Sequence, residues 1–202
     1  DACVELTRFF RSYGIAVPEL LYDARDLSVL LIEDLGDRLL IDALLEAVSG
    51  AVPQAEAQIE TYYQQAVDQL VRLQSIPRES ASFVFNRAFK AETYCREMFE
   101  FLDFVLRPVR ISESEEKEVK SFFGCLAQTL DACPKVLAHR DFHSWNLLID
   151  QQDRVRVIDF QDALLSTRCY DIVGLLNDRD TDAALGEERY ERLLNYFSER
   201  IG

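Results

Sequence analysis

Apolar residues recur every three or four positions along much of the chain, a spacing that is typical of amphipathic helices. The recurrence is interrupted at Pro53, Pro77 and Pro108, where a helix interior would lose a backbone hydrogen bond. The pattern predicts helices over 4–13, 39–47, 59–73, 94–105, 112–130, 170–176 and 187–197. In the helix over 112–130, Phe122 belongs to the expected inner face.

Short apolar runs without helical spacing predict strands at 20–22, 28–32, 136–138, 147–149 and 155–158. The run 28–32 is almost continuously apolar, which favours a strand that is buried on both faces. The last two runs flank the polar turn Gln151-Gln152-Asp153 and predict a hairpin. Helices and short strands in one chain indicate an α+β fold.

The composition supports a packed core and restricts the partners. Hydrophobic residues make up 49% of the 202 residues, which argues against a disordered chain. The formal net charge of −14 disfavours nucleic acid and anionic membranes as partners, because their phosphates would be repelled. No apolar run approaches the roughly 18 residues that a membrane-spanning helix needs. No basic-then-apolar leader stands at the start.

The five cysteines are far apart, and no two of them form a C-x-x-C pair. An odd number with this spacing argues against a disulfide framework and against a zinc site. We therefore expect reduced, mostly buried thiols in a cytoplasmic protein.

Chemically versatile side chains are concentrated in residues 139–146, whose sequence is HRDFHSWN. Asp159 ends a later apolar run. Taken singly, Asp and Asn at strand ends are ordinary turn residues. Together they offer two carboxylates and an amide oxygen, which are hard ligands that suit Mg2+ beside phosphate groups. In a phosphoryl-transfer site Asp141 would be the base, while Asn146 and Asp159 would hold the metal.

The HRD sequence at 139–141 with Asn146, followed by IDF at 158–160, resembles the catalytic loop and metal-binding segment of the protein-kinase-like superfamily. A second histidine, His143, makes the loop similar to the aminoglycoside phosphotransferase and choline kinase branch. The resemblance is strongest to bacterial kinases that phosphorylate N-acetylmuramate or N-acetylglucosamine at the anomeric hydroxyl. It rests on three further segments, VIDFQDA at 157–163, YDI at 170–172 and LIEDLGD at 31–37.

This resemblance implies a protein-kinase-like fold with a mostly helical large lobe, a short β-hairpin at the catalytic loop and a small lobe that is only partly present. Residues 1–35 would be the remnant of the N-terminal lobe with the hinge, and residues 36–202 the C-terminal catalytic lobe. ATP and Mg2+ are the implied cofactors. Backbone groups near Glu33 and Leu35 would meet the adenine. Asp171 would brace the catalytic loop by accepting hydrogen bonds from it.

Five further residues near these motifs are candidates for a role, and four of them have two interpretations. His139 would brace the loop as a buried histidine, and His143 would either line the substrate site or pack. Asp162 would face the substrate or cap the following turn. Glu97 lies where the resembling family builds its acceptor pocket, or is simply exposed on an amphipathic helix. Trp145 would form a wall of the sugar site or anchor the core.

One departure from the superfamily pattern keeps several functions open. The glycine-rich strand pair and the phosphate-binding lysine are not in the sequence, whose lysines are Lys90, Lys117, Lys120 and Lys135. The leading hypothesis is an ATP-dependent amino-sugar kinase of cell-wall recycling. An aminoglycoside antibiotic kinase is the enzymatic alternative, since an acidic protein suits a polycationic acceptor. A non-catalytic remnant that binds a ligand or a partner protein is the third hypothesis.

Overall fold

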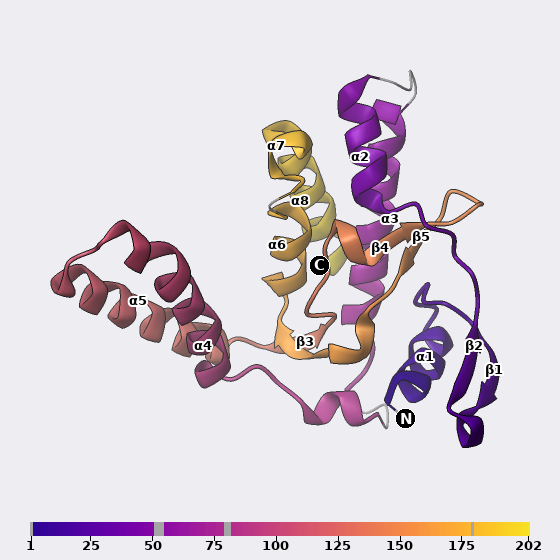
Figure 1. Cartoon of the computed structure of the whole chain (residues 1–202), viewed down its shortest axis with the longest axis horizontal. Coiled ribbons are helices and arrows are strands. Elements are labelled where there is room, and N and C mark those ends of the chain that lie inside the picture. Colours follow the sequence, from indigo (N-terminus) through magenta and orange to yellow (C-terminus); the bar gives the residue numbers. More distant parts are fainter. Residues whose placement is uncertain (1, 51–54, 79–81, 179) are drawn as a thin grey trace.

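The computed structural model describes residues 2–50, 55–78, 82–178 and 180–202. Helices form most of this part of the chain, at the places where the apolar spacing predicted them (Figure 1). Their bounds are α1 Ala2–Ser12, α2 Leu40–Ser49, α3 Ala55–Gln74, α4 Ala91–Phe101, α5 Glu113–Ala132, α6 Cys169–Leu176, α7 Asp182–Leu185 and α8 Glu187–Ile201. None of these helices combines the length and the apolar character needed to cross a bilayer.

Helix ends follow local sequence signals. Helix α1 is followed by Gly14, whose φ of +73° lies in the left-handed region that glycine adopts without steric cost. At the start of α5, the Ser112 hydroxyl accepts a hydrogen bond from the Glu115 N–H, and the Glu115 carboxylate accepts one from the Ser112 N–H. This capping box satisfies two N–H groups that the helix itself leaves unpaired.

The strands form three separate antiparallel pairs. In chain order they are β1 Leu20–Ala24, β2 Val29–Ile32, β3 Lys135–Ala138, β4 Leu147–Ile149, β5 Val155–Val157 and β6 Leu164–Thr167. Strand β1 pairs with β2, β3 with β6, and β4 with β5. The predicted hairpin is therefore confirmed as β4–β5, with its turn at 151–153.

The strand registers bring two loops together. Ala138 is opposite Leu164, so the chain leaves β3 and enters β6 at the same end of that pair. Leu147 is opposite Val157, so the chain enters β4 and leaves β5 at the same end of the hairpin. The loops 139–146 and 158–163, which connect these ends, are consequently neighbours in space although residues 147–157 separate them in sequence.

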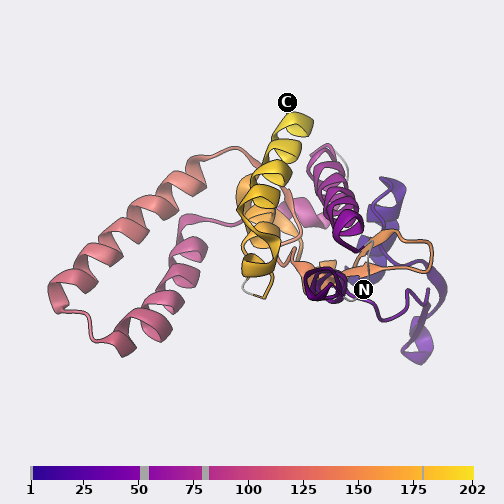
Figure 2. The same ribbon diagram turned by 90° about the horizontal axis from the view of Figure 1, so that it is seen from above.

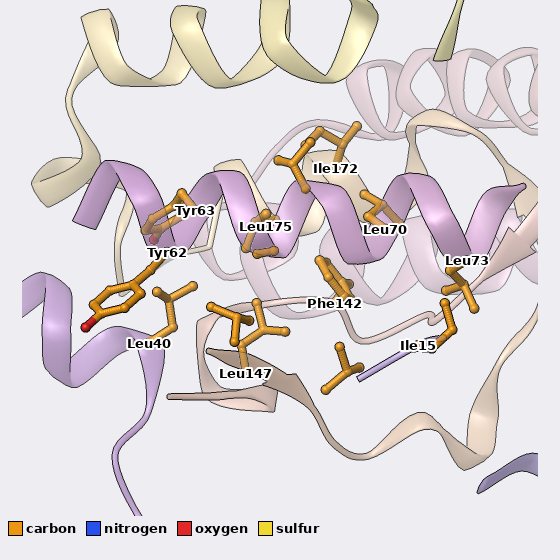
Figure 3. Packing of buried hydrophobic residues seen from close by; sticks show 14 of the residues in the cluster. Ile15, Leu40, Tyr62, Tyr63, Leu70, Leu73, Phe142, Leu147, Ile172 and Leu175 are labelled. Atoms are coloured by element: carbon orange, nitrogen blue, oxygen red, sulfur yellow. The ribbon is translucent and has the colours of Figure 1, made fainter. Parts of the chain in front are cut away.

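The main core surrounds α3, which supplies Tyr62, Tyr63 and Leu70 to its centre (Figure 3). Phe142, from the loop 139–146, is buried in the same cluster together with Ile172 of α6. Burying a large apolar side chain contributes about 1.5–3 kcal/mol. The loop is thus anchored through its own apolar residue into the best-packed part of the molecule.

Helices α4 and α5 project away from this body as a two-helix arm, defined here as residues 91–132 (Figures 1 and 2). A second, small cluster joins the arm to the body, in which Tyr94 and Ala127 of the arm are buried with Phe89, and Leu164 and Tyr170 pack against them. Large apolar side chains remain exposed on it, namely Phe101, Phe104, Val105, Val109 and Phe122.

Three expectations about burial were wrong. Strand β2 exists, but Val29, Leu31 and Ile32 are each more than half exposed, because β1 and β2 pair only with one another in the part of the chain that the structure describes. Phe122 is 63% exposed, because α5 packs against α4 alone along much of its length. The cysteines are not buried either, since Cys3, Cys125 and Cys169 are exposed and Cys95 and Cys133 are intermediate.

Candidate active site

His139 links the two neighbouring loops. Its side chain is 1% exposed, and its Nε2–H donates to the Ile158 carbonyl oxygen at 2.9 Å. Burial lowers the pKa of His139 to about 4, because a charged imidazolium would lose its hydration. The ring is therefore neutral near pH 7, and its bond to Ile158 fixes the tautomer. Ile158 returns a backbone N–H to the Asn146 carbonyl at 3.1 Å.

Asp171, near the start of α6, holds the backbone of the same loop. It is 1% exposed, and its two carboxylate oxygens accept the N–H groups of His139 at 2.7 Å and Arg140 at 3.0 Å. Burial raises the pKa of Asp171 to about 7, although the two N–H donors act in the opposite direction. Arg140 has a φ of +86°, a strained conformation for a side chain with Cβ, and the bond to Asp171 helps to hold it.

Asp141 presents an open carboxylate next to Asn146. The Asn146 Nδ2 donates to the Asp141 carbonyl oxygen at 2.9 Å, and a longer contact of 3.4 Å joins it to His143 Nε2. The amide nitrogen of Asn146 is thereby committed to the loop, and its Oδ1 has no hydrogen-bond partner among the described residues. The Asp141 carboxylate likewise has no bonded partner among them, so both oxygen groups are available to ligands.

Asp159 follows β5 on the adjoining loop and is exposed. Its φ of +61° places it in the left-handed region, and such outliers are concentrated at functional sites. Gln161 donates to Asp159 Oδ1 and so steadies the side chain. Phe160 turns inward instead, is buried, and contacts Phe10 of α1 with ring centroids 5.5 Å apart. An inward anchor next to an outward carboxylate fixes the direction in which Asp159 points.

Asp162 and Glu97, two candidates for binding the acceptor, each contact a polar side chain. Asp162 lies 3.5 Å from the Arg140 guanidinium. The Tyr170 hydroxyl donates to Glu97 at 3.2 Å, and burial raises the pKa of Glu97. Glu97 is therefore not a freely exposed acid on α4.

Glu33 has a structural ion pair that the sequence did not reveal. Its carboxylate oxygens lie 2.6 and 3.0 Å from the buried Arg156 guanidinium of β5, which lowers the pKa of Glu33. The Glu33 N–H donates to the Glu19 carbonyl. Its own carbonyl oxygen and the N–H of Leu35 have no hydrogen-bond partner among the described residues. These two backbone groups are therefore among those that are available to a ligand at this connection.

The family model described as "Phosphotransferase enzyme family" matches residues 2–200. The chain belongs to this family. This match covers nearly the whole chain, and it confirms the family resemblance that was inferred from residues 139–146 and 158–160.

Two curated relatives are N-acetylmuramate/N-acetylglucosamine kinases. The one from Neisseria meningitidis serogroup B is 32% identical over 167 residues, which cover 81% of this chain and 47% of that protein. The one from Caulobacter vibrioides is 25% identical over 189 residues, which cover 88% of this chain and 50% of that protein. The chain thus spans about half the length of the curated relatives it matches.

Solved structures support the α+β, protein-kinase-like fold. The gentamicin complex of APH(2")-IIa superposes with a TM-score of 0.67 at 18% identity, over 98% of this chain and 64% of that one. The complex of aminoglycoside phosphotransferase APH(3'')-Id from Streptomyces rimosus with ADP and streptomycin gives 0.58 at 15% identity, over 100% and 74%. At these identities the likeness establishes the fold alone.

The donor set suits a magnesium ion that is shared with phosphate groups. The described residues contain no cluster of three or more His, Cys, Asp or Glu side chains that would form a metal cage. They offer the Oδ1 of Asn146 and the exposed carboxylate of Asp159 instead. One carboxylate and one amide are sufficient for Mg2+ when phosphate oxygens and water complete its coordination.

Two further acidic residues, Asp178 and Asp180, which the sequence did not suggest, also hold the loop 139–146. The buried Asp178 Oδ2 accepts the N–H of Ser144 at 3.2 Å and the Ser144 hydroxyl. Asp180 Oδ2 accepts the indole N–H of Trp145 at 3.0 Å. These contacts join residues about 34 positions apart, and no sequence motif indicates them. They became evident only in the structure.

Proposed function

We propose that the full-length protein transfers the γ-phosphoryl group of ATP to a hydroxyl group of a small molecule. The observation that carries this proposal is the open carboxylate of Asp141, tied through its backbone to Asn146 and set on a loop adjoining that of Asp159. This arrangement supplies a base and two metal ligands on rigid supports, which is what phosphoryl transfer requires of a protein.

Asp141 would orient the acceptor hydroxyl and accept its proton as the oxygen bonds to phosphorus and ADP departs. A base of ordinary acidity is sufficient, because the proton leaves late in a loose transition state. Asn146 and Asp159 would hold Mg2+, which neutralises charge on the phosphate oxygens when bound. Transfer would be direct, without a phosphorylated enzyme, since His139 is buried and bonded to Ile158 and the loop contains no cysteine.

The nucleotide end of the site is proposed at Glu33 and Leu35. The Glu33 carbonyl oxygen and the Leu35 N–H form an acceptor and a donor two residues apart, which suits the edge of an adenine ring. The ion pair of Glu33 with Arg156 fixes this segment to β5, only three residues before Asp159. The same contact would therefore set the distance between the base of the nucleotide and its phosphates.

The acceptor that we propose is an N-acetylated amino sugar, phosphorylated at its anomeric hydroxyl. The names of the two curated relatives support this substrate class. Asp162, Glu97 and His143 would contact the sugar, and the pairing of Asp162 with Arg140, the neighbour of Asp141, supports this role for Asp162. The protein would act in cell-wall recycling within the cytoplasm.

An aminoglycoside is the second acceptor that an observation favours. The structural neighbours include complexes with gentamicin and streptomycin, and Glu97 and Asp162 would suit the ammonium groups of such a ligand. Local sequence around 31–37 and 157–163 favours the amino sugar instead.

Phosphorus NMR of the full-length gene product, incubated with Mg-ATP and single acceptors, tests the proposal. We expect a new sugar 1-phosphate resonance with N-acetylmuramate or N-acetylglucosamine. A product with kanamycin alone would move the protein to the aminoglycoside kinases. A lack of transfer to every acceptor, together with a lack of ATP binding, would favour the non-catalytic remnant.

A further inference from the structure

Trp145, the only tryptophan of the chain, is partly exposed to solvent and lies in the same loop as the proposed catalytic residue Asp141. It is 47% exposed, whereas tryptophan is highly buried on average. It occupies the 3-10 turn Ser144–Asn146, directly before the proposed metal ligand and four residues after Asp141. The structure therefore excludes the interpretation of Trp145 as a core anchor.

The backbone that carries this ring is rigidly held. Ser144 is fully buried, and its N–H and hydroxyl both donate to Asp178 Oδ2. The other oxygen of Asp178 accepts the N–H of Asp180 at 3.2 Å. The turn and the segment that holds it thus form one bonded unit, and Trp145 is not exposed merely because its loop is loose.

The ring itself is also oriented. Its single polar atom, Nε1, donates to Asp180 Oδ2 at 3.0 Å, so the indole is tied by its edge to the segment that fixes its backbone. A buried or tethered N–H leaves the apolar π face as the part of the ring still open to ligands. Holding this face in place beforehand spares the entropy that a mobile side chain would lose on binding.

We infer that Trp145 is a stacking surface for a pyranose ring of the acceptor. A pyranose has hydroxyl groups around its edge and C–H groups on its faces, and such a face packs against an aromatic ring while the hydroxyls stay available for transfer. The inference rests on the proposed function and adds a specific contact to it: the acceptor is a carbohydrate that covers the indole when its hydroxyl lies at Asp141.

The position of Trp145 separates this contact from the other parts of the proposed site. The nucleotide edge is assigned to backbone groups of Glu33 and Leu35, while Arg140 pairs with Asp162 and Tyr170 bonds Glu97. Trp145 is held by Asp180 instead. The sugar would then be recognised by polar groups on one side and by an apolar ring on the other.

Fluorescence and kinetics of the full-length gene product test the inference. Wild type and W145F are titrated with N-acetylglucosamine without ATP, and the difference in emission isolates Trp145 from any other tryptophan. We expect a saturable change in wild type that W145F lacks. In the kinase reaction, W145A is expected to raise KM for the sugar about tenfold, with W145F intermediate and KM for ATP within about twofold. Identical emission changes in wild type and W145F, or an unchanged sugar KM in W145A, would overturn the inference.

Two controls keep the result specific. Phe122→Ala removes an exposed aromatic ring from the arm and is expected to leave the sugar KM unchanged. Asp180→Ala releases the indole and is expected to raise the sugar KM about threefold, whereas Asp180→Asn retains an acceptor and most of the affinity. A sugar that changes Trp145 emission but is never phosphorylated would contradict the proposed function and support the stacking site. Phosphorylation of the sugar with an unchanged sugar KM in W145A would support the proposed function and contradict the stacking site.

Discussion

The loop 139–146 and the two-helix arm are held in place by two different kinds of contact. The loop 139–146 is held by buried polar side chains from distant elements, with Asp171 and Asp178 bonded to its backbone and His139 bonded to the next loop. In the arm, residues 91–132, only Tyr94, Leu102 and Ala127 are buried, and its polar contacts include exposed ion pairs such as Arg107–Glu116.

This difference indicates that the geometry of the loop is more tightly specified than that of the arm. Buried hydrogen-bond networks specify one geometry, and a lost partner leaves a desolvated group unpaired. Exposed ion pairs contribute roughly 0–1 kcal/mol and tolerate change. We therefore expect substitutions near the loop to have large effects on activity or stability and substitutions on the arm to have small effects on stability.

The largest effect is expected from Asp159→Ala. Loss of the exposed carboxylate removes a proposed metal ligand while leaving the buried anchor Phe160 in place. Turnover should fall by about three orders of magnitude, and the midpoint of thermal unfolding should barely move. Steady-state kinetics over a Mg2+ titration, combined with a thermal melt, measures both. Near-normal turnover would contradict the assignment of Asp159 as a metal ligand.

Arg156→Ala tests whether the buried ion network fixes the Glu33 segment to β5. The Arg156 side chain is 7% exposed and bonds both Glu33 and Asp150, so its removal leaves the Glu33 carboxylate without its cation and Asp150 with Arg154 alone. Unfolding free energy should fall by about 3 kcal/mol. The matched control is Arg154→Ala, which removes an exposed arginine from the same Asp150 and should cost less than about 1 kcal/mol. Equal losses in urea titrations of the two variants would contradict this assignment.

The sequence predicted contiguous features better than features that depend on distant contacts. The helices and the β4–β5 hairpin depend on neighbouring residues, and both are present. The loop 139–146 was identified because its residues stand in a specific order. The partnership of Arg156 with Glu33 spans 123 residues and has no local signature.

Burial was the least predictable property. An apolar run such as 28–32 indicates a strand, but its exposure depends on which elements pack over it. The spacing of Phe122 predicted a position on the inner face of its helix. The ring is instead mostly exposed among the described residues. The exposure of Trp145 could not be predicted from the sequence either. Its bond to Asp180, which holds the ring outward, is evident only in the structure.

A pH dependence of stability is expected from His139. Its pKa in the folded state is about 4, below the unperturbed value of about 6.5, so only the unfolded chain takes up a proton as pH falls through 6.5. Stability is therefore lost as pH falls from 6.5 to 4, by up to about 1.4 kcal/mol per pH unit. Asp171, whose pKa is raised to about 7, acts in the opposite direction over the same range.

Comparison with His139→Gln isolates the histidine, since Asp171 is present in both proteins. Urea unfolding between pH 4.5 and 7.5 should show a wild-type stability that falls with decreasing pH relative to the variant. Parallel pH profiles would indicate that His139 is protonated as readily in the folded state as in the unfolded chain.

The smallest effect is expected on the arm. Phe122→Ser replaces an exposed ring on α5 with a small polar side chain, so the free energy of unfolding should change by no more than about 0.5 kcal/mol. Chemical denaturation measures this change directly. A loss of 2 kcal/mol or more would show that the ring is covered in the full-length protein, and it would weaken the contrast between arm and loop.

The most direct test of the central claim is the single-turnover rate of Asp141→Asn in the full-length protein with Mg-ATP and the preferred acceptor. The amide keeps the size of the side chain but cannot accept the hydroxyl proton. We predict a rate lower by about 10²- to 10⁴-fold, with ATP affinity and thermal stability close to wild type. A rate within a few fold of wild type would contradict the assignment of Asp141 as the base.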